Sequence, residues 1–203
     1  LKEYKISEIE NIHILGRNVP NALKCGSPVS LKWAASGIEL NVKTREIWAL
    51  IETDYDNLEI WLCVLINGRI VSRFMSEKGK QWVCLARGFS VENAFKICLM
   101  RDSQAMFEDK KQSVKIHSFA VPKIDAAPNS TDGINSISNN VSAFLPIPKR
   151  DLKIEFIGDS ITSGEGMIGS PSSDGGIENE WVSTWISPSH NYAVQASQKL
   201  NAD

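Results

Sequence analysis

The chain has 203 residues, of which 42% are hydrophobic and 23% are charged, and its formal net charge is -2. This composition is typical of a globular protein with material for one large or two small hydrophobic cores. The near-neutral charge gives no electrostatic basis for binding nucleic acid or an anionic membrane. Apolar runs stay well short of the roughly 20 residues that a membrane-spanning helix needs, so no membrane partner is expected.

Short strand-like runs dominate residues 1–122. After a lead-in at 1–11, either a short helix or irregular, apolar patterns predict strands at 12–15, 29–34, 37–42, 46–52, 58–66, 69–74, 81–86, 94–100 and 114–121. Asn67-Gly68, between two of these runs, is a strong hairpin signal. Many short strands with frequent turns and no convincing long helix favour a β-sandwich of jelly-roll type over an α/β domain.

Four tryptophans lie in or beside these strands: Trp33, Trp48, Trp61 and Trp82. An exposed tryptophan can stack on a sugar ring, whereas a buried one is a large core residue. We expect core positions for them, and most of all for Trp61, because its strand is apolar at nearly every position.

The cysteines form no metal-binding pattern. Cys25, Cys63, Cys84 and Cys98 are far apart and make no C-x-x-C motif, and the histidines add no ligand cluster. Cys63 and Cys98, each inside an apolar run, are expected to be small core residues. No metal site is predicted.

The composition changes at residues 123–150. Residues 126–133 are rich in turn-forming residues, and 145–150 read as an extended, proline-containing connector that ends in two basic residues. Such a stretch is typical of a linker between two domains.

A strand pattern changes into a turn that carries a serine within residues 152–166. Apolar and charged residues alternate at 152–156, and the apolar run continues to 157, which predicts a strand with one buried face. Asp159 and Ser160 then favour a turn, in which the nearby glycines permit tight or left-handed backbone. Alone, this pattern is an ordinary turn. It is not the G-x-S-x-G elbow, because Thr162 stands at the position of the second glycine.

The run Ile-Gly-Asp-Ser-Ile-Thr at 157–162, followed by Gly-Glu-Gly at 164–166, closely resembles the first signature block of the SGNH, or GDSL-type, hydrolases. With a β-sandwich and a proline-containing linker before it, the chain looks like the two-domain acetyl esterases of carbohydrate esterase family two. The resemblance implies a jelly-roll sandwich at 1–122, a linker at 123–150, and the first βα portion of a flavodoxin-like, three-layer α/β SGNH hydrolase domain at 151–203. It also implies removal of acetyl groups from xylan and related plant polysaccharides.

The resemblance assigns roles to residues of this block. Ser160 would be the catalytic nucleophile of a ping-pong acyl transfer, with its own backbone N–H as an oxyanion donor and no metal or organic cofactor. Gly158, Asp159 and Gly164 would support the turn and the oxyanion site, Asp159 as a structural residue and not as the triad acid. The partner would be an acetylated polysaccharide or oligosaccharide, and the family implies a secreted or cell-surface protein.

The sequence lacks the base that such a serine needs. SGNH enzymes take it from a late D-x-x-H motif, but the residues three positions before His13, His117 and His190 are Glu10, Val114 and Ser187. We therefore expect the base and part of the oxyanion hole to lie beyond residue 203, in a longer esterase of which this chain is the N-terminal part. Since losing the base costs on the order of 10⁶ in kcat, the chain alone should be nearly inactive.

A packing helix is expected after the serine block. Ser187 and Pro188 read as its N-cap and first helical residue, and Tyr192, Ala193, Ala196 and Leu200 recur at helical spacing on one face. His190 would lie in the first turn, where the positive helix end disfavours an imidazolium. It is therefore not expected to be the catalytic base.

Two alternatives remain open from the residues alone. The chain is a carbohydrate-binding β-sandwich without catalysis, or the serine belongs to an SGNH lipase or thioesterase. Nothing in the residues selects the acyl group, so the acetyl-polysaccharide expectation rests on the family resemblance.

Overall fold

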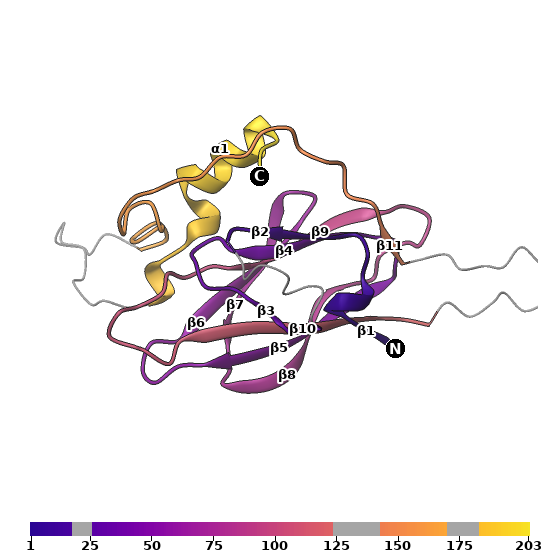
Figure 1. The fold of residues 1–203 in the computed structure, drawn as a ribbon, viewed down its shortest axis with the longest axis horizontal. Helices are drawn as coiled ribbons and strands as arrows, with labels where there is room; N and C mark the ends of the chain where they lie inside the picture. Colours follow the sequence, from indigo (N-terminus) through magenta and orange to yellow (C-terminus); the bar gives the residue numbers. More distant parts are fainter. Residues whose placement is uncertain (18–25, 124–142, 170–182) are drawn as a thin grey trace, which may run out of the picture.

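The computed structural model describes residues 1–17, 26–123, 143–169 and 183–203, and it is mostly β-sheet with few helices. Two antiparallel sheets enclose the hydrophobic core (Figure 1). In the first sheet the strand order is β1 (Lys2–Lys5), β10 (Ser113–Val121), β5 (Glu46–Asp54) and β8 (Gly79–Arg87), and β3 (Val29–Ser30) also pairs with β10. In the second sheet the order is β11 (Phe144–Leu145), β4 (Gly37–Val42), β9 (Phe95–Arg101), β6 (Ile60–Ile66) and β7 (Arg69–Ser76), and β2 (Ile12–Leu15) pairs with β4.

Alternation along the strands builds one core between the sheets. In β5, Ile47, Ala49 and Ile51 are fully buried, whereas the residues between them face outward and remain partly exposed. Buried residues of β4, β6, β9 and β10 belong to the same cluster. A period of two is what a strand with one buried face requires. The expected β-rich N-terminal region is confirmed, while its jelly-roll class stays a prediction.

Every strand-like run predicted between residues 12 and 121 contains a strand. The predicted hairpin joins β6 to β7 through Asn67 and Gly68, whose φ angles are 50° and 80°, as the favoured two-residue turn requires. The prediction of a short helix or irregular chain at 1–11 is only partly right. The short 3-10 helix η1 (Ile6–Glu8) is present, but Lys2–Lys5 before it form β1, which pairs along its whole length with β10.

The expectation that the tryptophans lie in the core is wrong. Trp33 is 58% exposed and Trp82 is 40% exposed, and Trp48 and Trp61 are only partly buried. On β5 and β8 the reason is strand register. Trp48 and Trp82 occupy outward positions, while the inward positions of these strands hold smaller aliphatic residues.

The predicted linker is partly a strand of the sandwich. Residues 124–142, which include the turn-rich stretch at 126–133, lie outside the described residues. The short strand β11 then pairs with β4 and extends the second sheet into the predicted linker. The domain boundaries themselves stay a prediction.

The predicted strand at 152–157 is absent. Within the described ranges, the backbone hydrogen bonds of this segment join Leu152 and Ile154 to Asp203. A strand is defined by a ladder with a neighbour, and one such pair of bonds does not make a ladder. The segment is therefore extended chain, in which Ile154 and Phe156 are half-buried and Ile157 is 87% exposed.

The short helices η2 (Ser183–Trp185) and η3 (Pro188–His190) precede α1 (Tyr192–Leu200), which lies over the outer face of the second sheet (Figure 1). The predicted start of the helix is wrong, since Ser187 and Pro188 begin η3 and Asn191 is the N-cap of α1. Its predicted face is wrong as well. Tyr192 and Leu200 are exposed, and Val194 packs on the sheet instead.

Candidate functional site

An ion network fastens the segment before Ser160 to the second sheet. Arg150 Nη2 donates to both carboxylate oxygens of Glu39 on β4, at 2.6 and 2.9 Å, and Arg150 Nη1 donates to Asp203 at 2.7 Å. Lys96 Nζ on β9 lies 3.6 Å from Glu39, and His13 Nε2 on β2 lies 3.4 Å from Asp203. The side chains of Arg150 and Glu39 are only 8% and 6% exposed. Removing either partner would take from a nearly buried charge its shortest ion-pair contact.

Glu39 is held in its charged form. Burial alone would raise the pKa of its carboxyl group, but the contacts with His13, Lys96 and Arg150 outweigh burial and lower that pKa below its ordinary value. The carboxylate is the form that the guanidinium of Arg150 needs as its partner.

The turn that carries Ser160 is closed by its own backbone. Asp159 Oδ1 accepts a hydrogen bond from Ile161 N at 3.1 Å, the local bond for which aspartate is favoured in turns. Ser163 N donates to Asp159 O at 3.1 Å, and Glu165 N donates to Ser160 O at 3.0 Å. Asp159 thus stabilises the turn itself, while its supporting role at an oxyanion site stays a prediction.

Two predicted glycines stand where a side chain does not fit. A Cβ at Gly158 would overlap the hydroxyl of Thr162 and lie 2.8 Å from Thr162 Cβ. Gly164 has a φ of 89°, and a Cβ there would lie 2.6 Å from the backbone of Ser187. Gly164 O also accepts a hydrogen bond from Ser187 N at 2.9 Å, so this close approach joins the turn to the start of η3.

Residues around the start of α1 hold the turn from the other side. Asn191 Nδ2 donates to the carbonyl oxygens of Ile161 and Thr162, both at 2.7 Å, and Asn191 is only 1% exposed. Tyr192 Oη lies 2.8 Å from Thr162 Oγ1. No local sequence pattern indicates these bonds, because the partners are about thirty positions apart.

Ser160 is half-exposed on this turn. Neither its hydroxyl nor its backbone N–H bonds to a residue within the described ranges. A serine hydroxyl is a weak nucleophile until a base takes its proton. The described residues therefore place a reachable hydroxyl on a fixed turn, but they do not provide it with a base.

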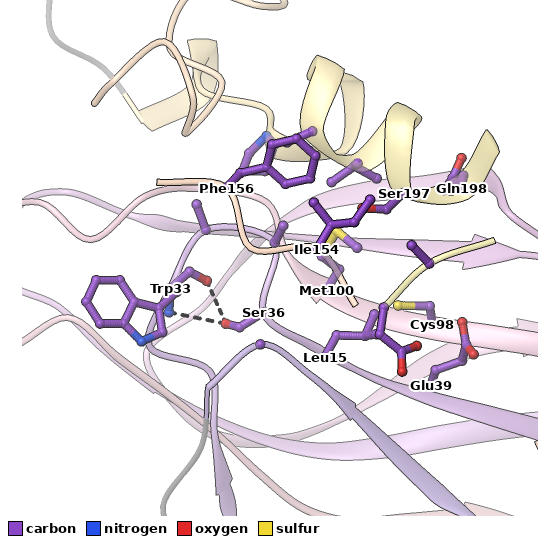
Figure 2. A pocket seen from close by; sticks show the side chains of 18 of the residues that line it. Leu15, Trp33, Ser36, Glu39, Cys98, Met100, Ile154, Phe156, Ser197 and Gln198 are labelled. Carbon is purple, nitrogen blue, oxygen red and sulfur yellow. Dashed lines mark hydrogen bonds between the residues drawn. The ribbon is translucent and has the colours of Figure 1, made fainter. Parts of the chain in front are cut away.

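A cavity of about 1120 Å³ separates the serine segment and α1 from the second sheet. Leu15 and Met100 line it from the sheet, Ile154 and Phe156 from the segment, and Ser197 from α1 (Figure 2). Most of these side chains are apolar. The cavity is therefore suited to packing against apolar groups.

The cavity extends to the neighbours of the serine. Gly158, Thr162 and Ser163 line it, and so does the exposed Trp33. The backbone of Trp33 is fixed by the Ser36 hydroxyl, which donates to Trp33 O at 2.6 Å and accepts from Trp33 N at 3.2 Å (Figure 2).

A buried polar cluster beside the turn was missed by sequence reasoning. The Ser187 hydroxyl lies 2.7 Å from His190 Nδ1 and donates to Asp102 Oδ2 at 2.9 Å. Ser189 N and Arg73 Nε donate to the same carboxylate at 2.8 and 2.6 Å. Asp102 and Ser187 are 85 positions apart, so no spacing in the sequence indicates their contact.

This cluster has the residue types of a serine hydrolase triad but a different order. In a triad the histidine stands between the serine and the carboxylate, whereas here Ser187 contacts both His190 and Asp102. Ser187 and Asp102 are also fully buried, so an ester substrate cannot reach the Ser187 hydroxyl. The cluster instead ties η3 to the end of β9.

The described ranges contain no group of three or more potential metal ligands. None of the helices in those ranges is long and apolar enough to cross a membrane.

Comparison with known proteins gives matches among solved structures, although no family model and no curated protein matches the sequence. An acetyl xylan esterase from the rumen bacterium Butyrivibrio proteoclasticus matches with a TM-score of 0.81 and 32% identity, over 100% of this chain and 47% of that chain. A family two carbohydrate esterase from Clostridium thermocellum, solved with cellohexaose, matches with a TM-score of 0.69 and 24% identity, over 95% of this chain and 49% of that chain. A family two carbohydrate esterase from Cellvibrio japonicus matches with a TM-score of 0.69 and 16% identity, over 100% of this chain and 50% of that chain. The structural neighbours of this chain are family 2 carbohydrate esterases.

The expected resemblance to the family two carbohydrate esterases is thereby confirmed. The chain spans about half the length of these carbohydrate esterases. At 24% and 16% identity the likeness shows a shared fold. The division into a sandwich and the first part of an SGNH domain stays a prediction, as do the roles of Ser160, Gly158, Asp159 and Gly164.

Proposed function

We propose that the protein is a serine esterase that removes acetyl groups from a plant polysaccharide such as xylan, with Ser160 as the nucleophile. The observation that carries this proposal is a half-exposed hydroxyl on a turn that Asp159 and Asn191 hold in place. The match with an acetyl xylan esterase over the whole chain supports the choice of substrate.

The proposed reaction is an acyl transfer in two steps. Ser160 Oγ attacks the acetyl carbonyl carbon, its proton passes to a base, and the sugar hydroxyl leaves with a proton. Water then attacks the acetyl-enzyme, which releases acetate and restores the serine. The Ser160 N–H, which has no acceptor among the described residues, is available to donate to the oxyanion in both steps.

We propose that the base and the other oxyanion donors come from a part of the protein outside this sequence. The three histidines of the sequence have other contacts: His13 with Asp203, His117 with Glu52 at 2.8 Å, and His190 with Ser187. The length of the structural neighbours, about twice that of this chain, supports this proposal.

We assign the apolar cavity to packing by that same part of the protein. Val194 of α1 packs with Cys63, Leu65, Cys98 and Met100 into a second apolar cluster, separate from the core of the sandwich. Ile157, which also lines the cavity, is 87% exposed, and covering such an apolar side chain with further chain would stabilise the folded protein. The cavity would then be part of a domain interior, beside the site of reaction.

A second candidate function is carbohydrate binding without catalysis. It is favoured by the exposure of Trp33 and Trp82, since an indole in contact with water can stack on a sugar ring. Both candidates predict binding of a polysaccharide, and only the first predicts hydrolysis.

The test is Ser160→Ala in the complete protein. We expect release of acetate from acetylated xylan to fall by up to about 10⁶-fold, with an unchanged melting temperature. Unchanged acetate release would refute the proposal. Esters of increasing acyl length and a thioester, tested on the parent protein, separate an acetyl esterase from a lipase or thioesterase.

A further inference from the structure

The outer face of the first sheet presents two tryptophans on neighbouring strands. In the pairing of β5 with β8, Leu50 lies opposite Trp82, and Trp48 lies opposite Cys84. Residues directly opposite each other in an antiparallel pair share one face of the sheet. Trp48, Leu50 and Trp82 therefore form one apolar surface on the side away from the core, which we call the tryptophan face.

The tryptophan face is partly open to solvent, chiefly at Trp82, whereas the indole nitrogen of Trp48 is buried. Trp82 is 40% exposed, and Trp48 and Leu50 are partly exposed. On the neighbouring strand β10, the residues opposite Leu50 and Trp48 are Ser118 and Ala120, which are buried, so the exposed part of the face lies over β5 and β8. Among the described elements, α1 and the serine segment lie over the other sheet, away from this face (Figure 1).

Polar groups border the tryptophan face at both ends. At one end, Glu52 Oε2 lies 2.8 Å from His117 Nε2. At the other end, Arg87 Nε donates to Glu46 at 2.9 Å, and its guanidinium lies 5.3 Å from the centre of a Trp48 ring. Each end thus offers both hydrogen-bond donors and acceptors around an apolar centre, with the charges already paired.

We propose that the tryptophan face binds a neutral polysaccharide, at a site separate from Ser160. The face of an indole carries partial negative charge, which attracts the C–H groups on one side of a pyranose ring. The ring hydroxyls, which both donate and accept, are matched by the paired polar groups at the two ends. A sugar ring would stack on Trp82, and the next ring along the sheet would contact the exposed edge of Trp48 and the Arg87 guanidinium that lies over it.

The exposed area favours a sugar over a second copy of the protein. With an aromatic side chain of about 150–250 Å², 40% exposure of Trp82 leaves at most about 100 Å² of surface. Trp48 and Leu50 are less exposed and add less. A stable protein interface needs about 800 Å² from each partner, which these three residues do not approach.

This inference rests on the proposed function only for the choice of polysaccharide. A sandwich that holds the polymer at one face and carries the serine segment at the other would keep the esterase on its substrate. Binding and hydrolysis then depend on different residues, so each can fail in an experiment without the other.

The test is titration of the Ser160→Ala protein with xylo- and cello-oligosaccharides, with binding measured by calorimetry and by tryptophan fluorescence. Adding Trp82→Ala should raise the Kd at least about fivefold, the effect of losing one stacked ring, while Trp82→Phe should keep most of the affinity. Phe107→Ala is the matched control, because it removes an aromatic side chain that is 79% exposed in the loop between β9 and β10. It should leave the Kd unchanged.

The inference is overturned if Trp82→Ala binds as tightly as its parent, or if Phe107→Ala weakens binding equally. It is also overturned if Trp82→Ala changes only self-association in sedimentation, which would assign the face to a second copy. In the complete protein with Ser160 present, Trp82→Ala should keep its rate on 4-nitrophenyl acetate. Loss of that rate together with binding would show a folding defect and would also count against a separate site.

Discussion

Arg150 Nη2 bonds both carboxylate oxygens of Glu39, at 2.6 and 2.9 Å, across 111 positions of sequence. The contact joins the segment that leads to Ser160 with the central part of the second sheet. Since both side chains are almost buried, the position of the serine segment depends on the charge of Glu39.

Stability should therefore fall in acid. The pKa of Glu39 is lowered in the folded protein, so the unfolded chain binds more protons in the window below about pH 4.5. The contribution of Glu39 is complete above that pH and is lost as the pH falls through the folded pKa. Melting temperatures between about pH 7 and pH 3 should show a smaller loss for Glu39→Gln than for the parent. An equal loss in both proteins would contradict a stabilising role for the Glu39 carboxylate. Glu92→Gln, at an exposed position, is the control and should lose as much as the parent.

Gly164→Ala should destabilise the turn more than Gly166→Ala. Both glycines have positive φ, 89° and 72°, for which a Cβ costs about 1–2 kcal/mol. Only at Gly164 would the Cβ also meet backbone, 2.6 Å from Ser187, whereas Gly166 has open space. Urea unfolding of the two variants measures the difference. Equal free energies of unfolding would mean that the approach to Ser187 is relaxed.

Asp102→Ala should release η3 from the sandwich. The variant removes the carboxylate that Arg73, Ser187 and Ser189 share, and loss of one partner of a buried pair costs about 3–5 kcal/mol. Limited proteolysis should then cut near residues 183–190 faster than in the parent. Asp56→Ala removes the exposed partner of Lys111 and should change little. Similar cleavage of both variants would contradict a fastening role for Asp102.

Native alkylation should distinguish the cysteines. Cys63 and Cys98 are buried, as predicted, and burial raises the pKa of both thiols, that of Cys98 to about 12. Only the thiolate reacts. Iodoacetamide at pH 8 should therefore modify the exposed Cys84 and leave Cys63 and Cys98 unmodified until the protein is denatured. Rapid modification of Cys98 in the native protein would show that the cavity beside it opens to solvent.

The sandwich was predictable because its signals are local. Strands such as Gly37–Val42 show apolar patterns within a few residues, and Asn67-Gly68 carries the backbone preference of its turn. What a local pattern leaves open is which face of a strand lies in the core. In β5, aliphatic residues fill the inward positions, so Trp48 faces outward, contrary to prediction.

The candidate site was predictable only around Ser160. The serine block indicated a turn in which Asp159 hydrogen-bonds to nearby backbone. The structure contains this turn and the bond from Ile161 N to Asp159. The bonds from Asn191 and the Asp102 cluster depend on contacts between distant segments, for which a single sequence has no signal. The prediction of a strand at 152–157 was wrong for a related reason, since a strand needs a paired neighbour as well as an alternating pattern.

The nucleophile can be identified directly by covalent labelling. A fluorophosphonate reacts with a serine only when a base and oxyanion donors activate it. We expect the complete protein to carry the label on the peptide that contains Ser160, with loss of acetate release in proportion to labelling. Labelling at Ser187 or at another serine, with Ser160 unmodified while acetate release is lost, would contradict the proposed mechanism.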